Sequence, residues 1–108
     1  MLDREVLRGE KNFTAVYKKG KSSGSKYVVV FYKRNGYAYN RIAFLASKKV
    51  GNAVARNRAK RLMKESVRSM GLKPVGYDII FIARKTINKR KCADVKKSIE
   101  AAMRRTGI

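Results

Sequence analysis

The chain has 108 residues, of which 28 are Lys or Arg and 7 are Asp or Glu, so its net charge is +21 with no histidine present. So many like charges repel one another, which favours a polyanionic partner, either nucleic acid or an anionic membrane. An apolar fraction of 44% is typical of a folded protein and excludes a basic disordered tail. We expect one small domain, residues 1–108.

Residues that bind metals or act as nucleophiles are scarce in this sequence. Cys92 is the single cysteine, and there is no histidine or tryptophan, which excludes most metal sites and disulfides and favours a reduced compartment. The longest apolar runs, 27–32 and 79–83, are far shorter than the roughly 20 residues of a membrane span. Residues 1–10 contain no apolar signal core. The expected location is the cytoplasm, with no membrane partner.

The first predicted element is a short helix over about residues 10–19. Phe13, Val16 and Tyr17 stand at i, i+3 and i+4, and Gly20 would end the helix in the C′ position. Phe13 and Tyr17 lie one turn apart, where they could stack on unpaired bases at ~1–3 kcal/mol per base or simply belong to the core. Composition leaves both roles open for Tyr17 and favours the core for Phe13.

A Gly/Ser-rich loop at residues 20–26 leads to the first predicted strand, residues 26–33. This strand is β-branched and aromatic with apolar residues on both faces, which is typical of a central strand. Asn35-Gly36 follows it and is the strongest short hairpin signal, although the next residues leave the loop length open. We therefore predict that the chain returns as a β-hairpin.

The return strand is predicted at residues 41–47 and a third strand at 77–83. Pro74 and Gly76 close off the segment before the third strand. Asp78 interrupts that apolar strand, and we favour an edge-strand or capping role for it over a catalytic one.

The longest predicted helix lies between the second and third strands. Asn52 is typical of an N-cap and Gly71 of a C′ residue, and together they bound a helix of roughly 18 residues. One arc of its helical wheel, about 140° wide, is almost entirely apolar and can pack on a sheet. The arc consists of Ala55, Ala59, Leu62, Met63, Ser66, Val67 and Met70.

A cationic face adjoins this apolar arc. Residues 48–68 contain eight Lys or Arg against one acid, Glu65, which is expected to pair with Arg61 or Arg68. An ordinary solvated helix face would carry more acids to balance these charges. We predict that the face binds phosphates, because guanidinium groups bind them in a bidentate manner and lysines act as point charges. The eight cations are Lys48, Lys49, Arg56, Arg58, Lys60, Arg61, Lys64 and Arg68.

The last predicted helix covers about residues 92–106, where apolar residues recur at spacings of three and four. Cys92 begins this series and is expected to be a small core residue. The order helix, strand, strand, helix, strand, helix predicts an α+β domain around a small sheet.

Independent catalysis by the protein is not expected. A protein nuclease needs clustered carboxylates to hold a divalent metal, or histidines for acid–base chemistry, and the seven acids are scattered over different elements. No glycine-rich phosphate-binding motif is present. The residues alone therefore predict a cytoplasmic RNA- or DNA-binding α+β domain.

At residues 47–65 the sequence resembles the protein subunit of bacterial ribonuclease P, the ribonucleoprotein that removes the 5′ leader from precursor tRNA. The Arg-Asn-Arg motif at 56–58, followed by Lys-Arg at 60–61, is similar to the signature helix of that family. The Lys-Lys pair at 48–49 and Gly-Asn at 51–52 are similar to the turn that precedes it.

The resemblance extends over nearly the whole chain, with residues 12–22 similar to the family's first helix and 76–85 to its last strand. It implies a small single-domain α-β-β-β-α-β-α sandwich with a central sheet. The additional short strand would lie within residues 22–25. The resemblance also implies a left-handed βαβ crossover, whereas chirality alone favours the right-handed form.

The resemblance implies that the RNA subunit and its bound Mg²⁺ perform the cleavage. The protein itself would require no cofactor, and whether it binds a metal stays open. Its partners would be ribonuclease P RNA and precursor tRNA, with no obligate protein partner.

Two sets of binding residues follow from the resemblance. Phosphate contacts to the catalytic RNA are implied for Lys48, Lys49, Asn52, Arg56, Arg58, Arg61, Lys64 and Arg68. A cleft between the first helix and the sheet would bind the single-stranded leader through Phe13, Tyr17 and Phe31, with Asn57 and Lys60 at its rim. Tyr17 stands where many relatives have phenylalanine, and its ring can still stack.

Two rival functions are compatible with the composition. A ribosomal or ribosome-associated protein would be equally small, basic and free of catalytic residues, but the ordered signature at residues 48–61 favours ribonuclease P. A protein-only nuclease would cleave precursor tRNA without any RNA subunit, and we expect no such cleavage.

Overall fold

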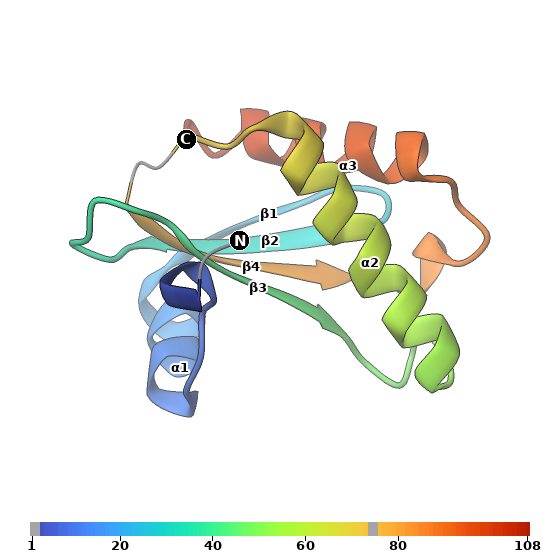
Figure 1. The fold of residues 1–108 in the computed structure, drawn as a ribbon, viewed down its shortest axis with the longest axis horizontal. Helices are drawn as coiled ribbons and strands as arrows, with labels where there is room; N and C mark the ends of the chain where they lie inside the picture. Colours follow the sequence, from blue (N-terminus) through green and yellow to red (C-terminus); the bar gives the residue numbers. More distant parts are fainter. Residues whose placement is uncertain (1–2, 74–75) are drawn as a thin grey trace.

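The structure, a computed structural model, describes residues 3–73 and 76–108. These residues form a four-stranded sheet with helices on both faces (Figure 1). The strands are β1 (Lys21–Gly24), β2 (Val28–Arg34), β3 (Arg41–Ala46) and β4 (Tyr77–Ala83). The helices are α1 (Glu10–Lys19), α2 (Ala53–Met70) and α3 (Cys92–Arg104), with short 3-10 helices at Asp3–Glu5 and Lys85–Ile87. The predicted small single-domain α+β fold is confirmed.

Different helices cover the two faces of the sheet (Figure 1). α2 and α3 pack on one face over the larger core, in which Met63, Phe81 and Ile99 are fully buried. α1 covers the other face over a smaller cluster that includes Val16 and Ile80. Because both faces are covered, β2 and β4 are apolar on both sides, as predicted for the strand that contains Val28.

The boundaries of α2 agree with their sequence signals, whereas α3 ends at Arg104, two residues before its predicted end. The Asn52 side chain accepts a hydrogen bond from the backbone N–H of Ala55 at 3.0 Å, and Gly71 has a left-handed φ of 64°. α2 therefore has the predicted 18 residues between these caps.

Gly20 ends α1 for a different reason from the one predicted. Its φ is −87°, which is not the left-handed C′ conformation. A Cβ at this position would lie 2.5 Å from the carbonyl oxygens of both Val16 and Tyr32. Glycine is needed here because the end of α1 approaches β2 too closely for any side chain.

The predicted hairpin between the strands at residues 26–33 and 41–47, which are β2 and β3, is wrong. β4 lies between them, antiparallel to β2 and parallel to β3. Asn35 still makes a local turn, since its Oδ1 accepts the N–H of Tyr37 at 2.8 Å and its Nδ2 donates to the carbonyl of Tyr39 at 3.1 Å. A turn signal does not specify the pairing partner, and β4, the more completely buried strand, takes the central position.

The two features implied by the resemblance alone are present. β1 pairs with β2 at the edge of the sheet and supplies the additional strand. β3, α2 and β4 form the βαβ unit, and its crossover is left-handed (Figure 1). Pro74, which was expected to close off the segment before β4, lies outside the described residues.

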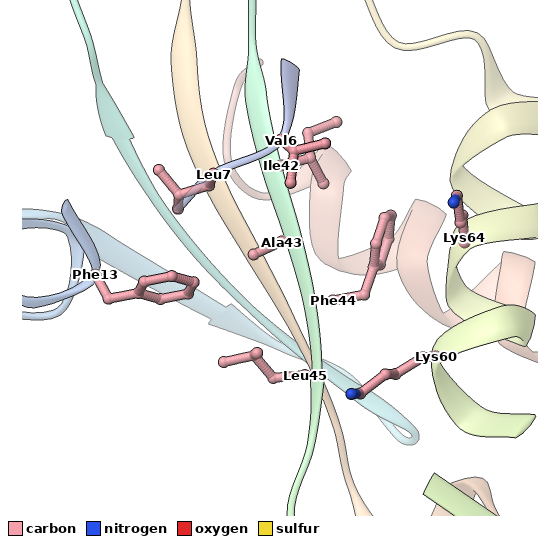
Figure 2. Close-up of a pocket in the computed structure, with 9 residues that line it drawn as sticks. All are labelled: Val6, Leu7, Phe13, Ile42, Ala43, Phe44, Leu45, Lys60 and Lys64. Carbon is pink, nitrogen blue, oxygen red and sulfur yellow. The ribbon is translucent and has the colours of Figure 1, made fainter. Parts of the chain in front are cut away.

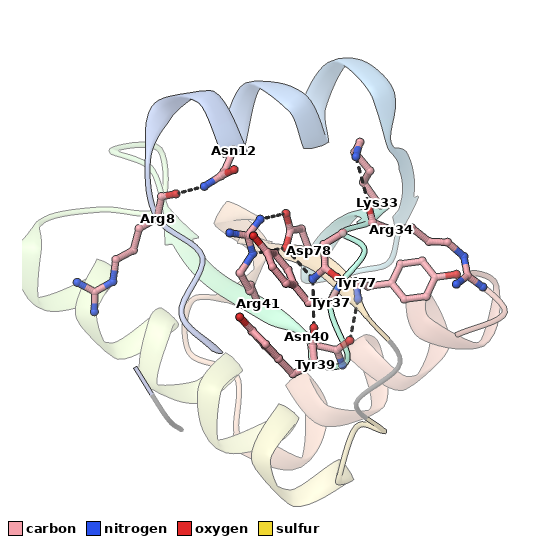
Figure 3. A network of polar contacts seen from close by, with 11 residues as sticks. Arg8, Asn12, Lys33, Arg34, Tyr37, Tyr39, Asn40, Arg41, Tyr77 and Asp78 are labelled. Carbon is pink, nitrogen blue, oxygen red and sulfur yellow. Dashed lines mark hydrogen bonds and ion pairs between the residues drawn. The ribbon is translucent and has the colours of Figure 1, made fainter. Parts of the chain in front are cut away.

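Asp78 is not on an edge strand, contrary to the prediction, because β4 is interior. Its carboxylate accepts hydrogen bonds from Nε and Nη2 of Arg41, both at 2.7 Å, and from Nδ2 of Asn35 at 3.0 Å (Figure 3). The nearby Asn40 accepts the backbone N–H of Tyr77 at 2.9 Å. This polar network joins β3, β4 and the connection between β2 and β3.

Cys92 is exposed, so its predicted place in the core is wrong. It is the first residue of α3, and its Sγ lies 3.6 Å from the hydroxyl of Ser66. The buried stripe of the helix begins one turn later with Val95 and continues through Ile99. Helical spacing alone could not show that the first turn projects beyond the edge of the core.

Candidate nucleic-acid interface

α2 positions the cations by burying its apolar arc. Ala59, Met63 and Val67 face the sheet, so the charged residues occupy the remaining surface of the helix. Nη2 of Arg68 lies 2.6 Å from Oε2 of Glu65, so Arg68 is confirmed as one of the two predicted partners of Glu65. The cationic face is therefore presented outward by the same periodicity that anchors the helix.

The cations of the signature motif differ in their local contacts. Nη2 of Arg58 donates to the backbone carbonyl of Arg90 at 2.7 Å and so tethers α2 to the segment before α3. Nε of Arg56 is buried and has no hydrogen-bond acceptor among the described residues. Arg61 is exposed on the helix surface. An unpaired buried donor costs about 1–3 kcal/mol, so an acceptor from a bound partner would stabilise Arg56.

The turn before α2 adds exposed charge to the same end of the molecule. Lys48 and Lys49 are exposed, and Asn52 is exposed while its side chain caps the helix. Nδ2 of Asn88 donates to the carbonyl of Val50 at 2.7 Å, which holds the turn against the segment before α3. These lysines therefore project from an ordered turn.

A groove of about 380 Å³ lies between the N-terminal segment, β3 and α2 (Figure 2). Lys60 and Lys64, one turn apart on α2, stand on one side, and Phe13 of α1 stands on the other. The floor is apolar. The residues that line the groove are Val6, Leu7, Phe13, Ile42, Ala43, Phe44, Leu45, Lys60 and Lys64.

The floor of the groove is the exposed edge of the sheet. Val6 pairs with Ile42 in a parallel bridge, and the N–H of Leu7 donates to the Ile42 carbonyl at 2.9 Å. Beyond this bridge, no described strand pairs with the outer edge of β3. The groove therefore combines apolar side chains, an open strand edge and two lysines.

Phe13, Tyr17 and Phe31 form a continuous aromatic surface beside the groove, which we call the aromatic trio. The ring centroids of Phe13 and Tyr17 are 6.5 Å apart, and those of Tyr17 and Phe31 are 5.1 Å apart in an edge-on arrangement. Phe13 and Phe31 are half-buried against the smaller core cluster, whereas Tyr17 is 42% exposed. Partial burial raises the pKa of the Tyr17 hydroxyl, because desolvation disfavours its charged form.

The residues expected in the cleft are only partly brought together. Phe13 and Lys60 line the same groove, and Tyr17 and Phe31 adjoin it through Phe13. Asn57 is exposed on α2 and does not line the groove.

Sequence reasoning missed part of the groove. Lys64, assigned from the resemblance to the catalytic RNA, lines the groove together with Lys60. The floor residues Ala43, Phe44 and Leu45 were assigned to a return strand. They become a groove only because β3 is an edge strand, and no local signal indicates this.

Several carboxylates hold structural positions. Asp78 binds Arg41, Glu65 binds Arg68, and Asp94 accepts the N–H of Lys91 at 3.2 Å where α3 begins. In residues 3–73 and 76–108, no three His, Cys, Asp or Glu side chains gather into a candidate metal site. None of the helices described there is long and apolar enough to span a membrane.

Comparison with known proteins agrees over nearly the full length of the chain. The family model described as Ribonuclease P matches residues 1–107. The ribonuclease P protein component of Clostridioides difficile is 43% identical over 105 residues, covering 94% of this chain and 91% of the relative. The ribonuclease P protein component of Alkaliphilus oremlandii is 46% identical over 99 residues, covering 90% of this chain and 82% of the relative.

Solved structures agree with the fold. The RNase P protein of Staphylococcus aureus has a TM-score of 0.85 at 29% identity and covers 94% of each chain. The RNase P protein of Thermotoga maritima has a TM-score of 0.83 at 33% identity, covering 94% of this chain and 97% of that one. With the basic helix, the left-handed crossover and the sequence relatives in agreement, the chain belongs to the ribonuclease P protein component family.

Proposed function

We propose that this chain binds two RNAs at once as the protein subunit of ribonuclease P. Apart from Lys60 and Lys64, the cationic face of α2 and the turn at Lys48 and Lys49 bind the phosphates of the ribonuclease P RNA. The groove and the aromatic trio bind the single-stranded 5′ leader of precursor tRNA. The observation that carries the proposal is the groove itself, which has lysines on one side and Phe13, the first ring of the trio, on the other.

The chemistry of this groove suits an unpaired strand. Proteins that bind single-stranded RNA combine a positively charged groove that follows the backbone with aromatic rings on which bases stack. Lys60 and Lys64 supply the charge, and the exposed ring of Tyr17 supplies a stacking surface. Duplex RNA has no free base faces to place on the rings, so the groove favours a leader over a paired stem.

The cleavage chemistry is assigned to the RNA subunit and the Mg²⁺ ions that it binds. The carboxylates of Asp78, Glu65 and Asp94 are each engaged in contacts within the protein. The cations of the protein neutralise RNA phosphates and displace counterions. The protein therefore lowers the Mg²⁺ concentration at which the RNA folds and binds substrate.

Leader binding also gives the enzyme a preference for substrate over product. Contacts to the leader add binding free energy away from the scissile phosphate, and mature tRNA lacks the groups that make them. The difference in affinity then favours precursor tRNA.

Reconstitution with a bacterial ribonuclease P RNA at low Mg²⁺ tests this proposal. Precursor tRNAs with long and very short 5′ leaders are compared for their dissociation constants, with and without the protein. We expect the protein to increase affinity for the long leader much more than for the short one. Equal affinities for the two substrates would contradict a leader site in the groove.

Tyr17 is the most informative residue of the trio because it is exposed. Tyr17→Ala should reduce long-leader affinity by a factor that corresponds to ~1–3 kcal/mol, the value of one stacked base. Tyr17→Phe keeps the ring and should retain the affinity. Binding to the catalytic RNA and the melting temperature are measured for both variants. A large loss of stability in Tyr17→Ala would return this residue to a core role.

A further inference from the structure

A second basic pocket lies between the start of α2 and the segment that leads into α3. Its volume is about 550 Å³. We call it the Lys89 pocket. The residues that line it are Val50, Gly51, Asn52, Ala55, Arg58, Asn88 and Lys89, and none of them is acidic or aromatic.

Two hydrogen bonds hold the walls of this pocket together. Nδ2 of Asn88 donates to the carbonyl oxygen of Val50, and Nη2 of Arg58 donates to that of Arg90, both at 2.7 Å. These contacts join residues that are 38 and 32 positions apart in the chain. A pocket whose walls are already joined loses less conformational entropy when a ligand binds.

The positive charge of the pocket is not balanced within the protein. In residues 3–73 and 76–108, neither Lys89 nor Arg58 forms an ion pair. The contact of Arg58 with a neutral carbonyl leaves its charge uncompensated and leaves further N–H donors for a ligand. The exposed Lys48 and Lys49 directly precede Val50 in the opposite wall. An anion in the pocket therefore meets cations from both sides.

The backbone of Lys89 has a conformation that is unfavourable for lysine. Its φ is 65°, and among the residues that the structure describes no other non-glycine residue has a positive φ. Glycine adopts this left-handed region without steric cost, whereas a Cβ is strained there. Strained residues of this kind cluster at ligand sites, where their surroundings hold them in place. Because the backbone gains nothing from a lysine here, the conformation points to a role for its exposed side chain.

The lining of the pocket favours a folded RNA over an unpaired strand. Single-stranded RNA is bound by aromatic rings on which its bases stack, and no ring lines this pocket, in contrast to the groove beside Phe13. The backbone of folded RNA is bound by cations and amide groups at its phosphates and 2′-hydroxyls. The pocket also adjoins the turn at Lys48 and Lys49, which belongs to the surface proposed for the ribonuclease P RNA.

We propose that the Lys89 pocket binds the phosphate backbone of a folded part of the ribonuclease P RNA. Lys89 binds one phosphate from the side of α3, and Arg58 and Lys49 bind its neighbours from the side of α2. The inference rests on the proposed function, because it extends the surface proposed for the catalytic RNA. It assigns RNA binding to residues 88–89, which lie outside the signature at residues 48–61.

RNA binding by the full-length protein in the absence of precursor tRNA tests this pocket. Dissociation constants for a bacterial ribonuclease P RNA are measured over a range of salt concentrations. Lys89→Gly should weaken binding and reduce the slope of log affinity against log salt by about one unit, because one phosphate contact is lost. Its melting temperature should not fall, since glycine relieves the left-handed strain. Lys89→Arg keeps the charge and should keep both the affinity and the slope.

A charge-matched control separates the pocket from the general field of the protein. Lys11→Ala removes one exposed lysine from α1, which covers the opposite face of the sheet from α2 (Figure 1). This variant should bind the ribonuclease P RNA with the slope of the wild-type protein.

Each contrary outcome has a distinct meaning. An unchanged slope in Lys89→Gly, or an equal decrease in Lys11→Ala, would overturn the pocket and leave the proposed function intact. A lower melting temperature of Lys89→Gly would assign a structural role to the lysine, which also overturns the inference. Normal binding of Lys89→Gly to the catalytic RNA, with reduced affinity for long-leader precursor tRNA alone, would assign Lys89 to the leader instead. Failure of the wild-type protein to bind the ribonuclease P RNA would overturn the proposed function together with the pocket.

Discussion

Arg41 and Arg68 each pair with a carboxylate, but the burial of the pair decides how much it contributes to the stability of the fold. The hydrogen bond to Asp78 raises the pKa of Arg41, and that to Glu65 raises the pKa of Arg68. The side chains of Arg41 and Asp78 are only 18% and 8% exposed, whereas those of Arg68 and Glu65 are 75% and 50% exposed. Removing one partner leaves an uncompensated buried charge only in the first pair.

This difference predicts unequal effects on stability. Arg41→Met should lower the free energy of unfolding by about 3–5 kcal/mol, because the Asp78 carboxylate remains buried without its partner. Arg68→Met is the control and should cause no measurable change, since exposed ion pairs contribute little. Urea unfolding followed by circular dichroism measures both. Equal stabilities of the two variants would show that the Arg41 pair is not a structural anchor.

At the scale of an element, α2 combines a structural and a binding role in the same few residues. Its caps, its apolar arc and its cationic face were all predictable, because each depends on residues within one helix. The groove could not be predicted from local signals, because its floor comes from β3 and its sides from α1 and α2. The same limit explains the wrong hairpin, since Asn35 specifies a turn but not the strand that pairs beyond it.

Asn52 allows the two roles of α2 to be separated. Asn52→Ala should cost about 1 kcal/mol of stability, because the cap to the Ala55 N–H is lost. Asn52→Asp keeps the cap and suits the positive end of the helix dipole, so stability should be retained. The new negative charge next to Lys48 and Lys49 should weaken binding to the catalytic RNA. Thermal melts and RNA titrations measure the two effects, and unchanged RNA affinity of Asn52→Asp would place the turn away from the RNA.

At the scale of the whole molecule, the net charge of +21 destabilises the folded state and also attracts anions. Self-repulsion lowers the stability of the folded state, and bound anions relieve it. Eight of the 28 Lys and Arg residues lie on α2 and in the turn before it. The folded chain therefore presents sites at which multivalent anions can bind.

Sulfate should accordingly stabilise the isolated protein. Anions that bind the folded state in preference to the unfolded state raise its stability by mass action, by about 2.7 kcal/mol at a hundredfold excess over the dissociation constant. We expect a higher melting temperature in sulfate than in chloride at the same ionic strength. Identical melting temperatures would argue against sites formed before RNA binds.

The sequence by itself determined the bounds of α1 and α2 and the residues of the cationic face, and it favoured a nucleic-acid partner. Charge balance, capping residues and helical periodicity act over a few neighbouring positions, so they can be read along the chain. Tertiary structure alone decided that β4 separates β2 from β3, that Asp78 is interior and that Cys92 lies outside the core. It also decided which aromatic rings meet and where the groove lies. The physical reason is that strand order depends on which strand gains most from burial on both faces, and this is a property of the whole sheet.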